Sequence, residues 1–184
     1  MDLIALAEQV FPNTASIAGN VTPDQYTNST PCAEWDVHTL LNHMISTHHM
    51  MAALLADEVP AEPLDEIGDD AGGAYKLAID ASLAAFRQPG ALEKALPLPI
   101  GPTPGAMALG ILVMDNVVHG WDLAQGTGQS TTIDEGLAAA YLEQVKAMGF
   151  PRHPAPGAPF GPEVAVPDDA SNAAKLLGFL GRTP

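Results

Sequence analysis

The stretch GAMALGILVMDNVVHGWDLAQ, residues 105–125, decides the fold. It is apolar almost all the way round a helix, so it predicts a central helix that other helices surround. Four polar side chains interrupt the run, namely Asp115, Asn116, His119 and Asp122. A helix that crosses a bilayer would tolerate these groups poorly, whereas a buried helix in a soluble bundle can place them at a site.

Two of these polar groups, Asp115 and His119, stand four residues apart. This spacing places both side chains on one face of a helix, one turn apart, where they can share a metal ion. Their apolar surroundings make an unpartnered carboxylate costly. From the spacing alone, a metal site and a simple hydrogen-bonded pair both stay open, because many buried pairs of this kind hold no ion.

A third ligand is expected from a facing helix over residues 37–57, which Asp36 caps. This helix offers three histidines: His43, His48 and His49. His48 lies at the centre of its apolar stripe and His43 lies on the flank, so periodicity alone favours His48. Two histidines with one carboxylate leave coordination positions open, which is typical of catalytic rather than structural metal sites.

The rest of the chain predicts further helices and no convincing strand. These helices are expected over residues 2–21, 73–87, 134–148 and 170–180, and Pro12 is expected to kink or split the first of them. Three segments are expected to be irregular: an acidic, weakly ordered stretch over residues 57–70, a Pro-rich linker over 91–105 and a Pro-rich surface loop over about 149–168. The expected fold class is all-α, an up-and-down four-helix bundle with additional short helices, forming a single domain over residues 1–184.

The composition argues against several classes of partner. The formal net charge is −15, which disfavours nucleic acid and anionic membranes, because both require clustered positive charge. Cys32 is the one cysteine, so no intramolecular disulfide can form and a reducing compartment is expected. The N-terminus lacks the positive region of a signal peptide, so we expect a cytoplasmic protein. Among the seven Lys and Arg residues, Arg87 and Arg152 could hold a substrate carboxylate.

Two long motifs make the sequence resemble a known family. STPCAEWDVHTLLNHM, residues 29–44, and VVHGWDLAQGTGQ, residues 117–129, resemble the two signatures of the mycothiol-dependent maleylpyruvate isomerase N-terminal domain. FGPEVAVPDDASNAAKLLGFLGRTP, residues 160–184, is similar to the ending of a single-domain actinobacterial subgroup known only as metal-binding. The resemblance covers nearly the whole chain, and it implies a DinB-like four-helix bundle.

The resemblance also implies a ligand set. His43 and His119 match the metal-binding histidines of the two signatures, and Asp115 occupies the place where the isomerase carries Glu, with a side chain one methylene shorter. The motif therefore favours His43 over His48, which is left as a buried, hydrogen-bonded core histidine. The implied cofactor is one divalent metal, zinc first and nickel, manganese or iron as alternatives, together with mycothiol as the low-molecular-weight thiol.

The function that follows is thiol chemistry on a small electrophilic substrate. A metal-activated thiol would attack the substrate, giving a thiol transferase or a thiol-dependent isomerase. Three alternatives stay open: a non-catalytic module that binds metal and a small molecule, a metal-dependent hydrolase, and an iron oxygenase. The apolar helices would also allow a homodimer.

Three residues beside the ligand set have simpler expected roles. Cys32 is expected to pack in the core, because no base for a catalytic thiol can be placed. Trp35 is also expected to be a core residue, as opposed to one that stacks on a ligand. Asp122 is expected either to hydrogen-bond a ligand histidine from outside the coordination shell or to cap a neighbouring element.

Overall fold

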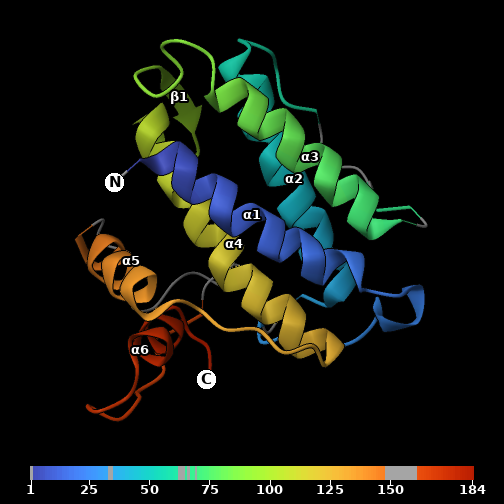
Figure 1. Ribbon diagram of the computed structural model, residues 1–184, viewed down its shortest axis with the longest axis vertical. Coiled ribbons are helices and arrows are strands. Elements are labelled where there is room, and N and C mark those ends of the chain that lie inside the picture. The colour runs from blue at the N-terminus through green and yellow to red at the C-terminus, as the bar shows by residue number, and fades with distance from the viewer. Residues whose placement is uncertain (1, 33–34, 62–64, 66, 69, 148–160) are drawn as a thin grey trace.

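The computed structural model describes residues 2–32, 35–61, 65, 67–68, 70–147 and 161–184, and in this part of the chain the fold is mostly helical (Figure 1). The long helices are α1 (Leu3–Gly19), α2 (Val37–Leu55), α3 (Ala71–Phe86) and α4 (Gly105–Thr127). Two shorter helices follow, α5 (Glu135–Ala147) and α6 (Asn172–Phe179), and a 3-10 turn, η1 (Pro23–Gln25), follows α1. The expected all-α, DinB-like bundle with additional short helices is confirmed.

The four long helices pack so that α1 and α2 each lie against both α3 and α4. The start of α2 lies at the end of α4, because Asn28 accepts from the backbone of Val37 and donates to the carbonyl of Gly126. The start of α3 lies against the end of α1, where Gly72 meets the backbone of Gly19. Helices α2 and α3 therefore run in one direction and α1 and α4 in the other, so the four helices do not alternate in direction as the expected up-and-down order requires (Figure 1).

The helices begin where short polar side chains can accept hydrogen bonds from their first backbone amides. Asp36 accepts from the amide of Thr39 at 2.8 Å, which confirms the predicted cap of α2. Asp134 accepts from the amide of Leu137 at 2.8 Å, as expected for the start of α5. Gly128 ends α4 with a φ of 70°, a conformation that glycine adopts without steric cost.

The sequence analysis expected no strand, and this expectation is wrong for residues 91–105. This segment contains an antiparallel hairpin of β1 (Ala95–Leu98) and β2 (Gly101–Pro104). Its prolines suggested a linker, but each strand of a two-stranded ribbon is an edge strand, where the missing N–H of proline is tolerated. Leu96 and Leu98 alternate inward and are buried, which attaches the hairpin to the core.

The expected effect of Pro12 is also partly wrong, since α1 is not split at this residue and runs from Leu3 to Gly19. Pro12 is exposed, so water can satisfy the backbone carbonyl that loses its helical partner. Residues 161–168, the described end of the expected Pro-rich surface loop, contain neither helix nor strand. The rest of that loop from residue 149, as well as Met148 and parts of the acidic stretch, lie outside the described residues.

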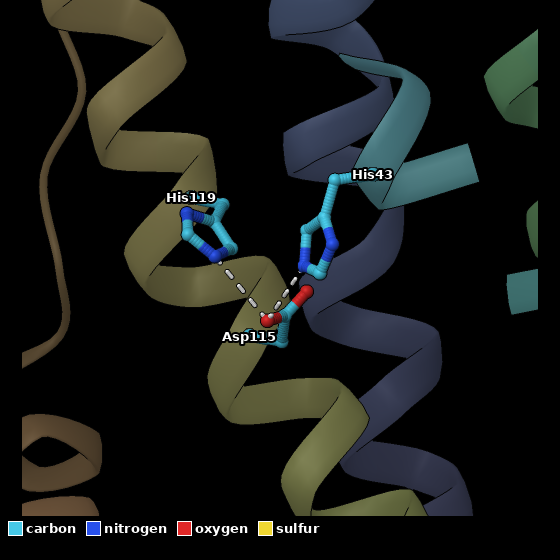
Figure 2. Close-up of side chains that lie close together, drawn as sticks. All are labelled: His43, Asp115 and His119. Carbon is cyan, nitrogen blue, oxygen red and sulfur yellow. Dashed lines mark hydrogen bonds and ion pairs between the residues drawn. The ribbon is translucent and has the colours of Figure 1, made fainter. Parts of the chain in front are cut away.

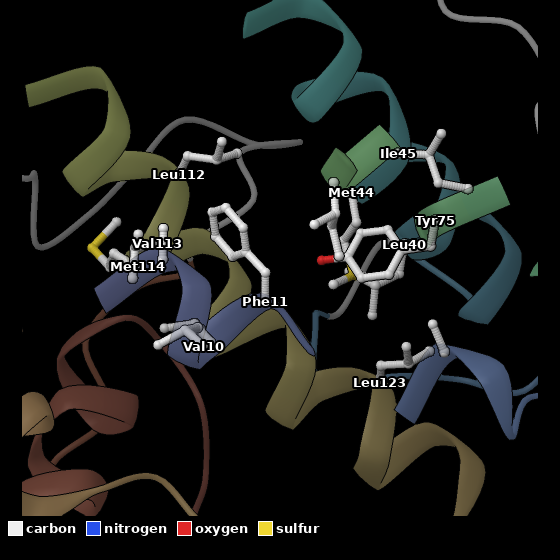
Figure 3. Close-up of a cluster of buried hydrophobic side chains, with 14 of the residues drawn as sticks. Val10, Phe11, Leu40, Met44, Ile45, Tyr75, Leu112, Val113, Met114 and Leu123 are labelled. Carbon is white, nitrogen blue, oxygen red and sulfur yellow. The ribbon is translucent and has the colours of Figure 1, made fainter. Parts of the chain in front are cut away.

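The core lies between the four long helices, and α4 contributes most of its length to it. Sixteen of the 23 residues of α4 are buried, which fits the central position predicted from its sequence. Phe11 and Leu112 belong to the cluster of buried apolar side chains around it (Figure 3). Among the described residues, no helix is long and apolar enough to cross a membrane. The polar residues of α4 thus sit inside an apolar bundle.

Candidate metal centre

The structure brings together the three residues that the sequence analysis selected. His43 projects from α2, and Asp115 and His119 project from adjacent turns of α4 toward it (Figure 2). The Nε2 atoms of both histidines lie 3.4 Å from Oδ1 of Asp115. One ligand atom from each residue lies within 4.8 Å of the others, so the cluster could hold a metal ion.

The spacing and burial of this cluster fit a metal. Nitrogen and oxygen ligands about 2.1 Å from a tetrahedral ion are about 3.4 Å apart, which matches both histidine–carboxylate distances. Oδ2 of Asp115 is buried and has no hydrogen-bond partner in the described part of the chain. A buried carboxylate oxygen without a partner is costly, and a cation would relieve that cost.

The electrostatics of the cluster centre on Asp115. Burial alone would raise the pKa of this carboxyl, but the neighbouring His119 and His43 outweigh burial and hold the pKa far below its usual range. Burial also disfavours the charged form of His119, yet Asp115 and Asp122 outweigh this effect and raise the pKa of His119 to about 9. At neutral pH, His119 of the metal-free cluster is therefore positively charged, with a proton on both ring nitrogens. A metal ion that binds Nε2 has to displace the proton from this nitrogen.

Access to the cluster is one-sided. His119 is fully buried and Asp115 nearly so, whereas the side chain of His43 is 27% exposed. Trp35 lies beside this opening, with its ring centroid 4.5 Å from that of His43 and 5.7 Å from that of His119. Trp35 was expected only to pack in the core, and it also forms a wall of the site.

Residues 8–124 match the sequence model of the mycothiol maleylpyruvate isomerase N-terminal domain. The chain belongs to this family. It is also 33% identical over its whole length to two proteins of Mycobacterium tuberculosis, named "Uncharacterized protein MT0763" and "Uncharacterized protein Rv0738", and the alignment covers 99% of each. No solved structure matches the chain.

The family assignment covers the cluster itself. His43, Asp115 and His119 all lie within the matched range of the mycothiol maleylpyruvate isomerase N-terminal domain. DinB-like proteins of this kind typically bind a divalent metal, and the cluster is where this member of the family has suitable donors. The residues after 124, including α5 and α6, lie outside the match.

Outside the ligand set, this family member places Asp122 behind His119. Nδ1 of His119 lies 2.9 Å from Oδ2 of Asp122. Because a carboxylate only accepts, Nδ1 carries the proton and Nε2 is directed toward Asp115. Of the two roles expected for Asp122, the structure shows the contact with the histidine. Asp122 in turn is paired with Arg182, a residue that the sequence analysis missed because no motif links positions 60 residues apart.

The other candidates lie elsewhere. His48 is fully buried among Ser82, Asn116 and Phe11 and does not reach the cluster, which confirms its expected place as a hydrogen-bonded core histidine. Arg87 pairs with Glu8 on the surface, and Arg152 lies outside the described residues.

Cys32 is buried near the cluster but is not activated. Burial, which is the largest influence, raises the pKa of its thiol to about 11, so at neutral pH it is a thiol and not a nucleophilic thiolate. This state supports the packing role expected for Cys32.

A cavity of about 770 Å³ does not coincide with the cluster. It lies along α1 as far as Ile17, next to Val117 and Gly120 of α4 and to residues 131–137, and none of the three clustered side chains lines it. The cluster is the candidate site, because the chemistry of its donors, and not the size of a cavity, indicates a ligand.

Proposed function

We propose that His43, Asp115 and His119 hold one divalent metal ion, with which the protein activates a low-molecular-weight thiol toward a small electrophile. The observation that carries the proposal is the buried Asp115, which faces two histidine nitrogens at 3.4 Å and keeps one oxygen without a hydrogen bond among the described residues. A carboxylate in this position has the negative charge of a metal ligand and an oxygen that is available to coordinate an ion.

Zinc is the first choice for the ion. Two imidazoles and one carboxylate are a donor set that zinc uses in catalytic sites, with further positions left for water or substrate. The same set also suits nickel, manganese and ferrous iron, which stay as alternatives. When bound, such an ion lowers the pKa of a thiol that joins its coordination shell, so that the thiolate is available at neutral pH.

The side chains around the cluster fit the uptake of an external thiol. The opening beside His43 and Trp35 is where a small molecule can reach the cluster, because His119 is closed off on its own side. The buried thiol of Cys32 is held protonated, so it does not supply the nucleophile. We therefore assign the nucleophile to a free thiol such as mycothiol, which a reducing cytoplasm keeps in the thiol form.

The proposed reaction begins with bond formation between the thiolate sulfur and an electron-poor carbon of the substrate. In a transfer reaction the leaving group departs with its bonding electron pair, and the sulfur stays attached to the carbon. In an isomerisation the sulfur adds to a conjugated double bond, the resulting single bond rotates, and the thiolate leaves again with its electron pair. Both outcomes consume no oxidant or reductant.

The first experiment is metal analysis by mass spectrometry on protein purified without an affinity tag. We expect about one divalent ion per chain, and its loss in His43→Ala and His119→Ala. The matched control is His49→Ala, which removes a histidine of the same helix outside the cluster and should keep the ion. Protein that stays metal-free after zinc is added would contradict the proposal.

The second experiment separates catalysis from binding. The metal-loaded protein is incubated with mycothiol and an electrophile such as maleylpyruvate, and consumption of the electrophile is followed. We expect turnover that depends on the thiol and is abolished by His119→Ala. Metal binding without turnover would favour the non-catalytic module, turnover without thiol would favour a hydrolase, and a requirement for ferrous iron with dioxygen would favour an oxygenase.

A further inference from the structure

A buried ion pair connects the candidate metal centre with the segment after α6. Asp122 in α4 is fully buried and Arg182 is 1% exposed. Nε of Arg182 donates to Oδ1 of Asp122 at 3.0 Å, and its NH2 group donates to Oδ2 at 2.5 Å. These two bonds hold both oxygens and so define the plane of the carboxylate.

The backbone after α6 directs Arg182 into this position. Gly181 has a φ of 86° and packs so closely on Gly161 that a Cβ at this residue would lie 2.5 Å from the Gly161 backbone. The backbone amide of Arg182 donates to the carbonyl of Leu177, and its NH1 group donates to the carbonyl of Leu180. The turn therefore holds Arg182 through hydrogen bonds of both its backbone and its side chain, so the position of the guanidinium is fixed by the fold.

The ion pair reaches the metal centre through one hydrogen bond. Oδ2 of Asp122, which Arg182 holds, is the same atom that accepts from Nδ1 of His119. The NH2 group of Arg182 also lies 3.5 Å from that nitrogen. Asp122 is thus held from one side by a rigid guanidinium and orients the ring of His119 on the other.

We propose that Arg182 is a positioning residue for the metal centre: it fixes the carboxylate of Asp122, which holds Nε2 of His119 toward His43 and Asp115. The inference rests on the proposed metal site, and it makes metal binding depend on a segment outside the family match over residues 8–124. A partner of this kind affects metal affinity because it sets the orientation and the protonated nitrogen of the ligand histidine.

Two simpler explanations predict different behaviour. If Arg182 acted only as a charge near the site, it would repel a cation, and its removal would strengthen metal binding. If the ion pair served only the stability of the fold, apolar replacement of both partners would leave the affinity of the folded protein unchanged, since buried ion pairs are often replaceable in this way. Positioning predicts weaker binding through Asp122.

The test measures the zinc affinity of the full-length chain by competition with a chromophoric chelator. We expect Arg182→Met to weaken binding by about 10- to 100-fold, the range for loss of a partner behind a ligand histidine. Arg182→Lys keeps the positive charge but loses the planar guanidinium that binds both carboxylate oxygens, so it should bind zinc more tightly than Arg182→Met does and less tightly than the unmodified protein. Arg87→Met is the matched control, because it removes an exposed ion pair with Glu8 and should bind zinc as the unmodified protein does.

A double-mutant cycle shows whether Arg182 acts through Asp122. Adding Arg182→Met to Asp122→Asn should cause no further loss of affinity, and this comparison remains valid if Arg182→Met alone does not fold. Unchanged or tighter zinc binding in folded Arg182→Met, or a further loss in the double variant, would overturn the inference while leaving the metal site intact. If the unmodified protein itself binds no zinc, the proposed metal site is wrong, and the role of Arg182 fails together with it.

Discussion

Two polar centres lie side by side in this bundle, and they differ although each contains a histidine of α2 that faces a residue of α4. The first is the candidate metal centre, with His43 facing Asp115. The second is a core network, with His48 facing Asn116. Asp115 and Asn116 are consecutive, and a helix turns by about 100° per residue, so they face different neighbours.

The core network is closed and uncharged. Nδ1 of His48 donates to Oγ of Ser82, and the Ser82 hydroxyl donates in turn to the carbonyl of Ile79. Nε2 of His48 accepts from the amide of Asn116, whose oxygen accepts from the hydroxyl of Tyr75. Burial, as the largest influence, lowers the pKa of His48 to about 4, so the network is neutral at physiological pH.

The metal centre differs in each of these respects. It contains a carboxylate with a depressed pKa, a partner-free buried oxygen among the described residues, and one side that opens to solvent at His43. The comparison teaches that burial of polar groups alone does not indicate function. What distinguishes the candidate site is that its donors converge on one point and that Oδ2 of Asp115 accepts no hydrogen bond from the described residues.

The largest expected effect breaks the first centre. Asp115→Ala removes the charged ligand, so we expect the metal content to fall from about one ion per chain to none. Asp115→Glu, which introduces the carboxylate that the resemblance indicates for the isomerase, should retain metal. Mass spectrometry of the purified variants measures both, and full metal content in Asp115→Ala would remove this residue from the ligand set.

The next effect follows from moving the charge by one residue. Asn116→Asp places a carboxylate in the closed network, where no cation faces it, and we expect a loss of about 3–5 kcal/mol in the free energy of unfolding. Urea denaturation of the metal-free protein checks this value. Asn13→Asp serves as the control, since it introduces the same carboxylate at an exposed position of α1. A loss as large as that of Asn116→Asp would contradict the closed, uncharged character of the core network.

A pH dependence of stability is expected from His48. Its pKa is about 4 in the folded protein and about 6.5 in the unfolded chain, so the unfolded state binds more protons between these values. The stabilisation from neutral His48 is therefore complete above pH 6.5 and is lost as the pH falls to 4, amounting to about 3 kcal/mol. The loss should be absent in His48→Gln, and equal pH profiles for the two proteins would refute it.

The smallest expected effect compares two buried tyrosines. Tyr75→Phe removes the hydroxyl that donates to Asn116, which should destabilise the fold by about 1–2 kcal/mol. Tyr141→Phe removes a buried hydroxyl that has no hydrogen-bond partner in the described part of the chain, so we expect no loss of stability. Thermal unfolding of both variants provides the measurement, and equal losses would show that the network is not what stabilises Tyr75.

Local patterns accounted for most of the helices. The cap at Asp36 predicted where α2 begins, and the helix expected over residues 134–148 agrees with the start of α5, because capping depends on a few adjacent residues. The hairpin of β1 and β2 was missed, because its stability comes from burying Leu96 and Leu98 against helices far away in sequence. Its prolines carry the opposite local signal.

The sequence by itself determined the helical class, the central place of α4 and the motif that selected His43, Asp115 and His119. Helical periodicity favoured His48, and the tertiary structure shows instead that His43 faces Asp115 while His48 faces Asn116, since the two histidines differ in their position around one helix. The tertiary structure therefore agrees with the motif and not with the periodicity. It alone brought Arg182 to Asp122 across 60 residues. The physical reason is that periodicity records which face of a helix is buried, whereas the pairing of buried polar groups depends on how the helices are docked.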